Sequence, residues 1–119
     1  MIAPDFYMKT FHHDRYWSAT PKDKRIEFDV DTNSPTDHDN MWCIHPEETI
    51  EVMSAVEAPW IAFKVLAAGA IPPQEGFTFA FENGADFICA GMFDFQVAED
   101  ALIAKRVLSQ VRRTRPWRA

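Results

Sequence analysis

The fold is decided by two stretches, PWIAFKVLAAGAI at residues 59–71 and GFTFAFENGADFICAGMFDFQV at residues 76–97. Each holds a short apolar run, and apolar residues at helical spacing separate the two runs. Short apolar runs bounded by Gly and Pro are typical of strands that are buried on both faces of a parallel sheet. We therefore predict a strand over Trp60–Ala67, a helix that ends at Asn83-Gly84, and a strand over Asp86–Met92.

The same reading extends to both sides of these stretches. Asp5–Phe11 is mostly aromatic and apolar and predicts a first strand. Pro46, with Glu47 and Glu48 after it, predicts the start of a helix. A last helix is predicted over about Gln96–Arg112, and the residues of its apolar stripe are Val97, Ala101, Ala104, Leu108 and Val111. Strands that alternate with helices indicate an α/β fold with parallel pairing through right-handed crossovers.

Three parallel strands do not make a stable two-sided sheet by themselves, because the edges of such a sheet stay uncovered. The chain is therefore expected either to assemble with copies of itself or to form one portion of a larger domain. Very few residues precede the first predicted strand, which favours the larger domain.

Together with PDFYMKTFHHDRYWS at residues 4–18 and HDNMWCIHPEETIE at residues 38–51, the stretches quoted above resemble an uncharacterised bacterial TIM-barrel family. The resemblance covers most of this chain and corresponds to the C-terminal strand–helix units of the barrel. It implies a partial (β/α)8 barrel over residues 1–112, with a long loop on the catalytic face at 12–45 and a basic tail at 113–119. In such barrels the active site lies at the carboxyl ends of the strands.

Two glycines match positions that bind substrate phosphate in many barrels. Gly69 follows the second strand and Gly91 ends the third, so the resemblance makes both candidate substrate-binding residues. The match is imperfect, because the loop after Gly69 contains Pro72-Pro73, and proline offers no backbone N–H to an anion. Bulky residues, Met92 and Phe93, follow Gly91.

Two lysines are expected inside the barrel. Alternate residues of a barrel strand point inward, and the bulkier set is expected to pack on the helices. For the first strand, Lys9 points inward if the apolar residues Phe6 and Met8 face the helices. For the second strand, the helix-facing set is Ile61, Phe63 and Val65, and the inward set is Ala62, Lys64 and Leu66.

A lysine inside a barrel is costly unless it is paired or functional. Lys64 and Lys9 are therefore candidate Schiff-base nucleophiles, since burial lowers the pKa of lysine and frees its amine, or clamps for an anionic substrate. The alternative is that each lysine pairs with an acidic residue of further strands. Asp94, after the third strand, either pairs with an inward lysine or caps the helix that follows it.

The loop after the first strand gathers groups that bind metals or transfer protons. His12 and Asp14 are candidates there, and neighbouring histidines in a strand-like run point to opposite faces, so His12 and His13 do not easily share one ion. The spacing fits no established metal motif. Arg15 and Trp17, with Tyr16, form either a substrate-binding surface or a clamp that pins the loop to the barrel rim. The remaining groups of this loop are His38, Asp39 and His45, the last being expected at the helix entry.

Composition limits the classes of partner. A net charge of −6 argues against a general nucleic-acid binder, and no apolar stretch reaches the length of a membrane span. The cysteines, Cys43 and Cys89, form no CxxC motif, and Cys89 is expected to be a small buried residue. The terminal arginines are expected to be a solvated helix end: Arg112, Arg113, Arg115 and Arg118.

These features lead to one expectation and two alternatives. We expect a cytoplasmic enzyme portion, lyase- or aldolase-like, acting on a small anionic or carbonyl substrate without a cofactor. The first alternative is a metal-assisted enzyme that uses a divalent ion on the His/Asp loop. The second is a chain without activity of its own that needs missing barrel units or self-association.

Overall fold

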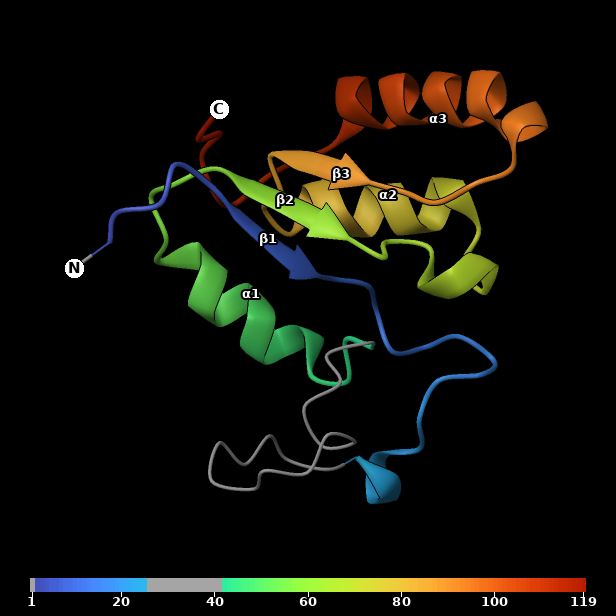
Figure 1. Cartoon of the computed structure of the whole chain (residues 1–119), viewed down its shortest axis with the longest axis horizontal. Coiled ribbons are helices and arrows are strands. Elements are labelled where there is room, and N and C mark those ends of the chain that lie inside the picture. The colour runs from blue at the N-terminus through green and yellow to red at the C-terminus, as the bar shows by residue number, and fades with distance from the viewer. Residues whose placement is uncertain (1, 26–41) are drawn as a thin grey trace.

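The computed structural model describes residues 2–25 and 42–119, which form a three-stranded parallel sheet and three α-helices. The strands β1 (Tyr7–Thr10), β2 (Trp60–Phe63) and β3 (Phe87–Cys89) lie in that order, with β2 in the middle (Figure 1). β2 pairs in parallel with both neighbours. The α/β class and the strand–helix order predicted from the sequence are confirmed. The sheet is open, with β1 and β3 as its edges within the described part of the chain.

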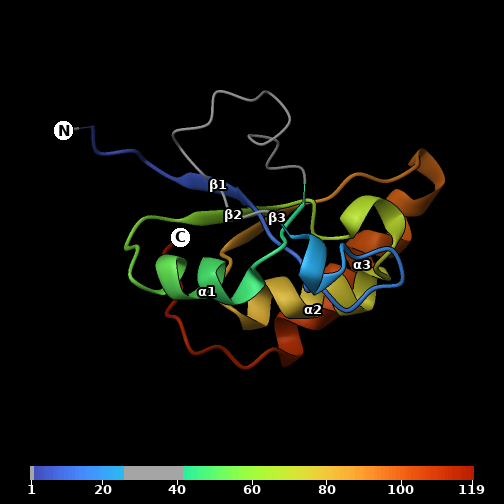
Figure 2. The ribbon, with the colours of Figure 1, turned by 90° about the horizontal axis from the view of Figure 1, so that it is seen from below.

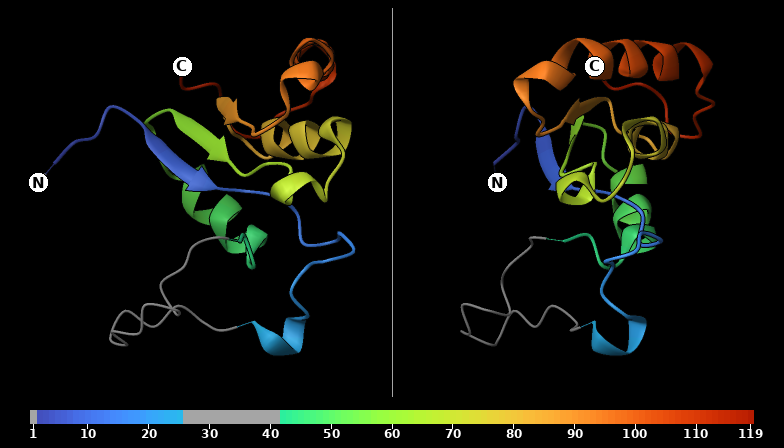
Figure 3. Two further views of the ribbon diagram at one scale, coloured as in Figure 1. Left: turned by 45° about the vertical axis from the view of Figure 1, so that its right-hand side comes forward. Right: turned by 90° about the vertical axis from the view of Figure 1, so that its right-hand side faces the viewer.

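The three helices lie on one face of the sheet, as Figures 2 and 3 show from two directions. They are α1 (Pro46–Ser54), α2 (Pro73–Glu82) and α3 (Val97–Gln110). α1 begins at its proline as predicted, and α2 ends as predicted, with Asn83 as C-cap and Gly84 at φ +114°. Three short 3₁₀ turns complete the elements: η1 (Lys22–Lys24), η2 (Ala67–Gly69) and η3 (Asp94–Gln96).

β2 is shorter than the apolar run that predicted it. The run extends to Ala67, but the strand ends at Phe63, because Lys64 adopts φ +55° and turns the chain out of the extended conformation. Val65 and Leu66 then pack in the core below the strand ends. The other two strands are also shorter than predicted.

The helix-covered face of β2 is the opposite of the predicted one. Trp60 and Ala62 are fully buried in the core that the helices complete. Ile61 and Phe63 point to the other face, where Phe63 remains exposed. The prediction was wrong because it assigned the bulkier residues to the helices. The largest side chain of the strand, Trp60, instead stacks edge-on against Phe11 in the core.

Lys9 is likewise on the helix-covered face. Its register partner is Ala62, and residues in register on parallel strands share a face. Met8 pairs with Ile61 and is exposed on the uncovered face. The prediction that Lys9 points into a barrel interior is therefore wrong, since it depended on Met8 packing against the helices.

α3 packs on the core through a different set of residues from the predicted stripe. Val107 and Asp100 are its buried residues. Of the predicted stripe, Ala104 and Val111 pack against the core, whereas Val97 and Leu108 are exposed. The helix is turned so that part of its apolar surface faces away from the sheet and α2.

The C-terminal tail closes the amino ends of the strands rather than ending as a solvated segment. Arg115 is 4% exposed, and its guanidinium uses all five N–H donors. They reach the carboxylate of Asp86 and the carbonyl oxygens of Met53, Val56, Ala58 and Gly84. The prediction of a solvated cluster was wrong for this arginine, because the carbonyls at the ends of α1 and α2 need donors that the helices do not supply.

The two cysteines differ in environment. Cys43 is buried, and burial raises the pKa of its thiol. Cys89 is exposed on β3, contrary to the expectation of a buried residue, because the face that it shares with Phe63 has no covering layer among the described elements. No helix in the described residues is both long and apolar enough to pass through a bilayer.

Candidate functional site

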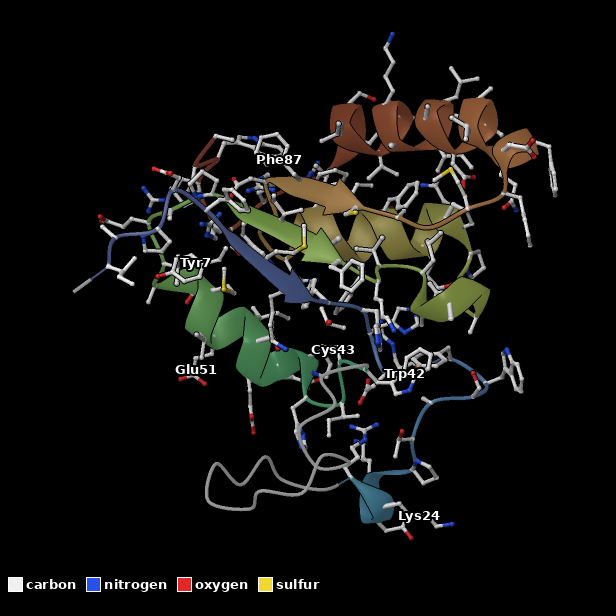
Figure 4. The ribbon with its side chains drawn as sticks, viewed as in Figure 1. Tyr7, Lys24, Trp42, Cys43, Glu51 and Phe87 are labelled. Carbon is white, nitrogen blue, oxygen red and sulfur yellow. The ribbon has the colours of Figure 1, made fainter. Side chains whose placement is uncertain are left out.

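The candidate site lies past the carboxyl ends of β1 and β2, where Lys64 meets Trp42. The ammonium of Lys64 lies 5.1 Å from the centroid of the Trp42 ring, within the range of a cation–π interaction. Figure 4 shows Trp42 beyond the end of β1, with Cys43 between it and α1. Lys64 is partly buried and makes no ion pair with any described residue. The ring holds the cation in place without neutralising its charge.

The backbone that presents Lys64 is strained. Its φ of +55° lies in the left-handed region, which costs a residue with a side chain about 1–2 kcal/mol. Ala67 and Ala68 also have positive φ, at +46° and +56°, so the strain is concentrated in the loop between β2 and α2. Backbone strain of this kind clusters at ligand sites, where the surrounding structure holds it.

His12 is a buried structural residue beside this lysine. Its Nε2 accepts a hydrogen bond of 2.9 Å from the N–H of Cys43, and its Nδ1 lies 2.8 Å from the carbonyl oxygen of His13. These partners fix a neutral ring with the proton on Nδ1. Burial lowers the pKa of His12, and the charges of His13 and Lys64 lower it further. With both nitrogens occupied, His12 positions Trp42 and Cys43 rather than binding substrate or metal.

His13 forms a pair with Glu75 that the sequence did not suggest. The Nδ1 of His13 accepts a hydrogen bond of 3.0 Å from the N–H of Arg15, so the ring proton is on Nε2. That nitrogen lies 2.7 Å from Oε1 of Glu75, in the first turn of α2. The imidazole is buried and the carboxylate is half exposed. The sequence did offer a signal that places Glu75 in the first turn of a helix, because Pro73 with an acidic residue two positions later is typical of a helix start. It offered no signal for the contact with His13.

Asp14 belongs to the framework of the long loop. Its carboxylate accepts a hydrogen bond of 2.8 Å from Arg25, which also donates to the carbonyls of Thr20 and Ile44. Burial would raise the pKa of Asp14, but the hydrogen bond and charge of Arg25 lower it below its usual value. This carboxylate therefore joins two ends of the loop. His38 and Asp39 lie outside the described residues.

Arg15 and Trp17 are exposed in the loop after β1, and among the described residues neither makes a hydrogen bond, ion pair or ring contact with Lys64 or Trp42. Arg15 lines an open groove of about 440 Å³ with His13, Glu75 and Phe79, between the loop after β1 and α2. Trp17 makes no ring contact with any other described residue and so does not pin the loop. Tyr16 does so instead, through ring contacts with His12 and His13.

The other candidates are not gathered around Lys64. Asp94 is exposed in η3, where its carboxylate accepts a hydrogen bond of 2.8 Å from the N–H of Phe95. Lys9, Lys64 and Asp94 share no hydrogen bond or ion pair within the part of the chain that the structure describes. Gly69 has φ +87° and Gly91 is exposed, and neither has an atom within 4 Å of the position of an added Cβ.

Within residues 2–25 and 42–119, no three His, Cys, Asp or Glu side chains are grouped so that they could hold a metal ion. His45 is the N-cap residue of α1, as expected for a helix entry, and its carbonyl accepts hydrogen bonds from Thr49.

Comparison of the sequence with protein-family models and with curated proteins, and of the fold with solved structures, gave no match. The assignment of the site therefore depends on the chemistry of the residues of this chain.

Proposed function

We propose that the chain forms the catalytic-face portion of an enzyme that binds a small anionic or carbonyl-bearing molecule through Lys64. The observation that carries this proposal is the partly buried ammonium of Lys64, which a strained backbone holds over Trp42 and which forms no ion pair with any residue of 2–25 or 42–119. A cation in this position would attract a carboxylate or phosphate, and its amine would be the nucleophile toward a carbonyl. The TIM-barrel resemblance adds an analogy of fold, and activity still depends on the site.

Two chemistries fit the same lysine. In the lyase- or aldolase-like version, the Lys64 amine attacks a substrate carbonyl, a C–N bond forms, and water leaves to give an imine. In the clamp version, Lys64 stays protonated and only holds the negative group of the substrate. His13 and Glu75 line a groove that Lys64 does not line, so neither version assigns them a step.

Reductive trapping tests the first version on the full 119-residue chain. The chain is incubated with pyruvate, glyoxylate and other small carbonyl compounds in the presence of cyanoborohydride, and tryptic peptides are analysed by mass spectrometry. We expect an adduct on Lys64 in preference to exposed lysines, Lys22 and Lys24. Equal labelling of the three, or no label at all, would remove the imine version.

Matched variants separate the imine from the clamp. Lys64→Arg keeps the positive charge but forms no imine, so in the clamp version it retains binding of a small carboxylate measured by calorimetry. Lys64→Met has a similar length without charge and should lose binding in both versions. Lys9→Arg, on the helix-covered face, is the control that should change neither result. Binding that is unchanged in Lys64→Met would contradict the proposal as a whole.

A further inference from the structure

One face of the sheet is apolar and has no covering layer among the described elements. The three α-helices of the described residues lie on the opposite face (Figures 2 and 3). The side chains on the uncovered face come from all three strands and carry no charge. By register they are Met8 of β1, Ile61 and Phe63 of β2, and Phe87 and Cys89 of β3, whereas Thr10, which pairs in register with Phe63, is buried. Met8, Phe63 and Phe87 are 54%, 38% and 49% exposed.

The exposed apolar surface continues onto α3. At 3.6 residues per turn, Val97, Ala101 and Leu108 share one side of this helix, about a quarter turn from the buried Val107. Gln110 is on the other side, where it lines the groove between α3 and α2. The apolar side of α3 therefore faces away from α2, beyond the β3 edge of the sheet. We call this surface the α3 flank.

The α1 side of the helix layer carries negative charge, which complements the positive charge beside the α3 flank. α1 has exposed acidic residues, and in Figure 4 Glu51 extends from the side of α1 that faces away from β2 and β3. Exposed Lys105 lies at the outer rim of the α3 flank. The β3 edge of the sheet thus lies beside the apolar α3 flank and Lys105. The β1 edge lies beside the acidic side of α1.

We propose that two copies of this chain close into a six-stranded barrel. The edge of β3 in each copy pairs in parallel with β1 of the other copy, about a twofold axis parallel to the strands. The α3 flank of each copy then packs beside α1 of the other, with Lys105 near Glu51. All strands keep the same direction, so the Lys64 site of each copy opens at the same end of the barrel.

The exposed apolar area reaches the lower limit of a specific interface. Met8, Phe63 and Phe87, with the α3 flank, expose roughly 500 Å² of side chain on one copy, if a fully exposed large side chain contributes about 200 Å². The two copies together would bury roughly 1,000 Å² before the strand edges are counted, which reaches the lower limit of a specific interface. The arrangement also pairs both free edges, which a simple stacking of two sheet faces would leave open.

Sedimentation velocity of the full chain between about 1 and 100 μM tests the proposal. We expect a dimer with twice the 13.7 kDa mass of one chain. Phe87→Glu should raise the dimer dissociation constant at least roughly tenfold, because closure would bury an unpaired carboxylate. Trp17→Glu is the matched control, since Trp17 is 89% exposed and lies in the loop after β1, and it should leave the dimer unchanged.

Two further measurements distinguish this dimer from other arrangements. Amide hydrogen exchange along β1 and β3 should slow as the protein concentration rises, because edge pairing protects these amides. Reversal of one charge, Glu51→Lys, should weaken the dimer, and addition of Lys105→Glu in the same chain should restore it. Phe87 is exposed in one copy, so Phe87→Glu should keep the circular dichroism spectrum of the original chain.

A folded monomer over the whole concentration range would overturn the proposal. A dimer that Phe87→Glu leaves intact would overturn it as well. A dimer without exchange protection at the strand edges would contradict the closed barrel. None of these results depends on the chemistry of Lys64, so this proposal and the proposed function fail separately.

Discussion

Nη1 of Arg115 donates a hydrogen bond of 2.7 Å to Oδ2 of Asp86, and this pair joins the C-terminal tail to the amino end of β3. The same oxygen accepts a hydrogen bond of 2.9 Å from the N–H of Trp60, the first residue of β2. The other carboxylate oxygen accepts from the N–H of Arg118 at 2.7 Å and from Arg113 at 3.4 Å. One buried carboxylate thus connects two strands and the tail.

Removal of this carboxylate should destabilise the fold strongly. Asp86→Ala leaves Arg115 buried without its counter-charge, and loss of one partner of a buried ion pair costs about 3–5 kcal/mol. Urea unfolding measures the effect. Asp94→Ala, at an exposed carboxylate, is the control and should change the free energy of unfolding by less than about 0.5 kcal/mol. Similar losses of unfolding free energy in the two variants would show that the Asp86–Arg115 ion pair contributes little to stability.

The same carboxylate should make the fold sensitive to acid. Burial raises the pKa of Asp86, but hydrogen bonds from Arg118, Trp60 and Arg115 lower it more, so its folded pKa lies below the unfolded value. Its stabilising contribution is therefore full above the unfolded pKa of about 3.9 and is lost as the pH falls through the folded pKa.

Unfolding free energies measured from pH 6 down to pH 2 check this prediction. The original chain should lose stability steeply below about pH 4. Asp86→Asn should start less stable and lose less over the same range. Parallel curves for the two chains would exclude Asp86 as a source of the acid sensitivity, and Asp14, whose pKa is also lowered, would be examined next.

His12 should add a second pH dependence nearer to neutrality. Burial lowers its pKa, so the unfolded chain binds a proton at a higher pH than the folded chain does. The contribution of His12 to the free energy of unfolding is therefore full above its unfolded pKa of about 6.5, and it is lost as the pH falls toward the folded pKa. His12→Gln keeps an acceptor for the Cys43 N–H and should flatten the stability curve just below pH 6.5. If His45→Gln flattens it equally, the effect is not specific to His12.

Lys64 should show opposite effects on stability and on binding. Lys64→Gly removes the strain of φ +55° and, after the greater freedom of glycine in the unfolded chain is subtracted, should stabilise the fold by about 0.5–1 kcal/mol. The same change removes the ammonium and should abolish trapping by carbonyl compounds. Thermal unfolding measures the first effect. A loss of stability would mean that the contact with Trp42 outweighs the strain.

Gly76 should tolerate no side chain, although it lies within α2. A Cβ at this position would lie 2.6 Å from the carbonyl oxygen of Val65 and 2.9 Å from Cδ2 of Leu66. Gly76→Ala should therefore cost about 1–3 kcal/mol, despite the better helix propensity of alanine. Gly91→Ala, where no atom lies within 4 Å of the added Cβ, is the control. Equal stability of both variants in urea would show that the loop after β2 shifts and makes room for the added methyl group.

The sequence by itself determined the order of strands and helices, the parallel class and several element ends. Pro46 and the Asn83-Gly84 pair marked helix ends because φ restriction and glycine freedom are local properties of the chain. Apolar runs located all three strands, although the predicted lengths were too great. The role of Lys64 in chemistry stays a prediction, because the order of elements places this lysine after β2 but does not show what it binds.

Only the tertiary structure decided which faces are covered and which polar groups meet. Side-chain bulk assigned β2 to the wrong face, because packing against α1 and α2 required Trp60 rather than Ile61 or Phe63. The contacts of Lys64 with Trp42, His13 with Glu75 and Arg115 with Asp86 join residues 22 or more positions apart, and no local pattern marks such pairs. The hydrophobic period of a helix or strand predicts which of its residues can be buried. The neighbour against which they pack depends on the arrangement of all helices and strands in the folded chain.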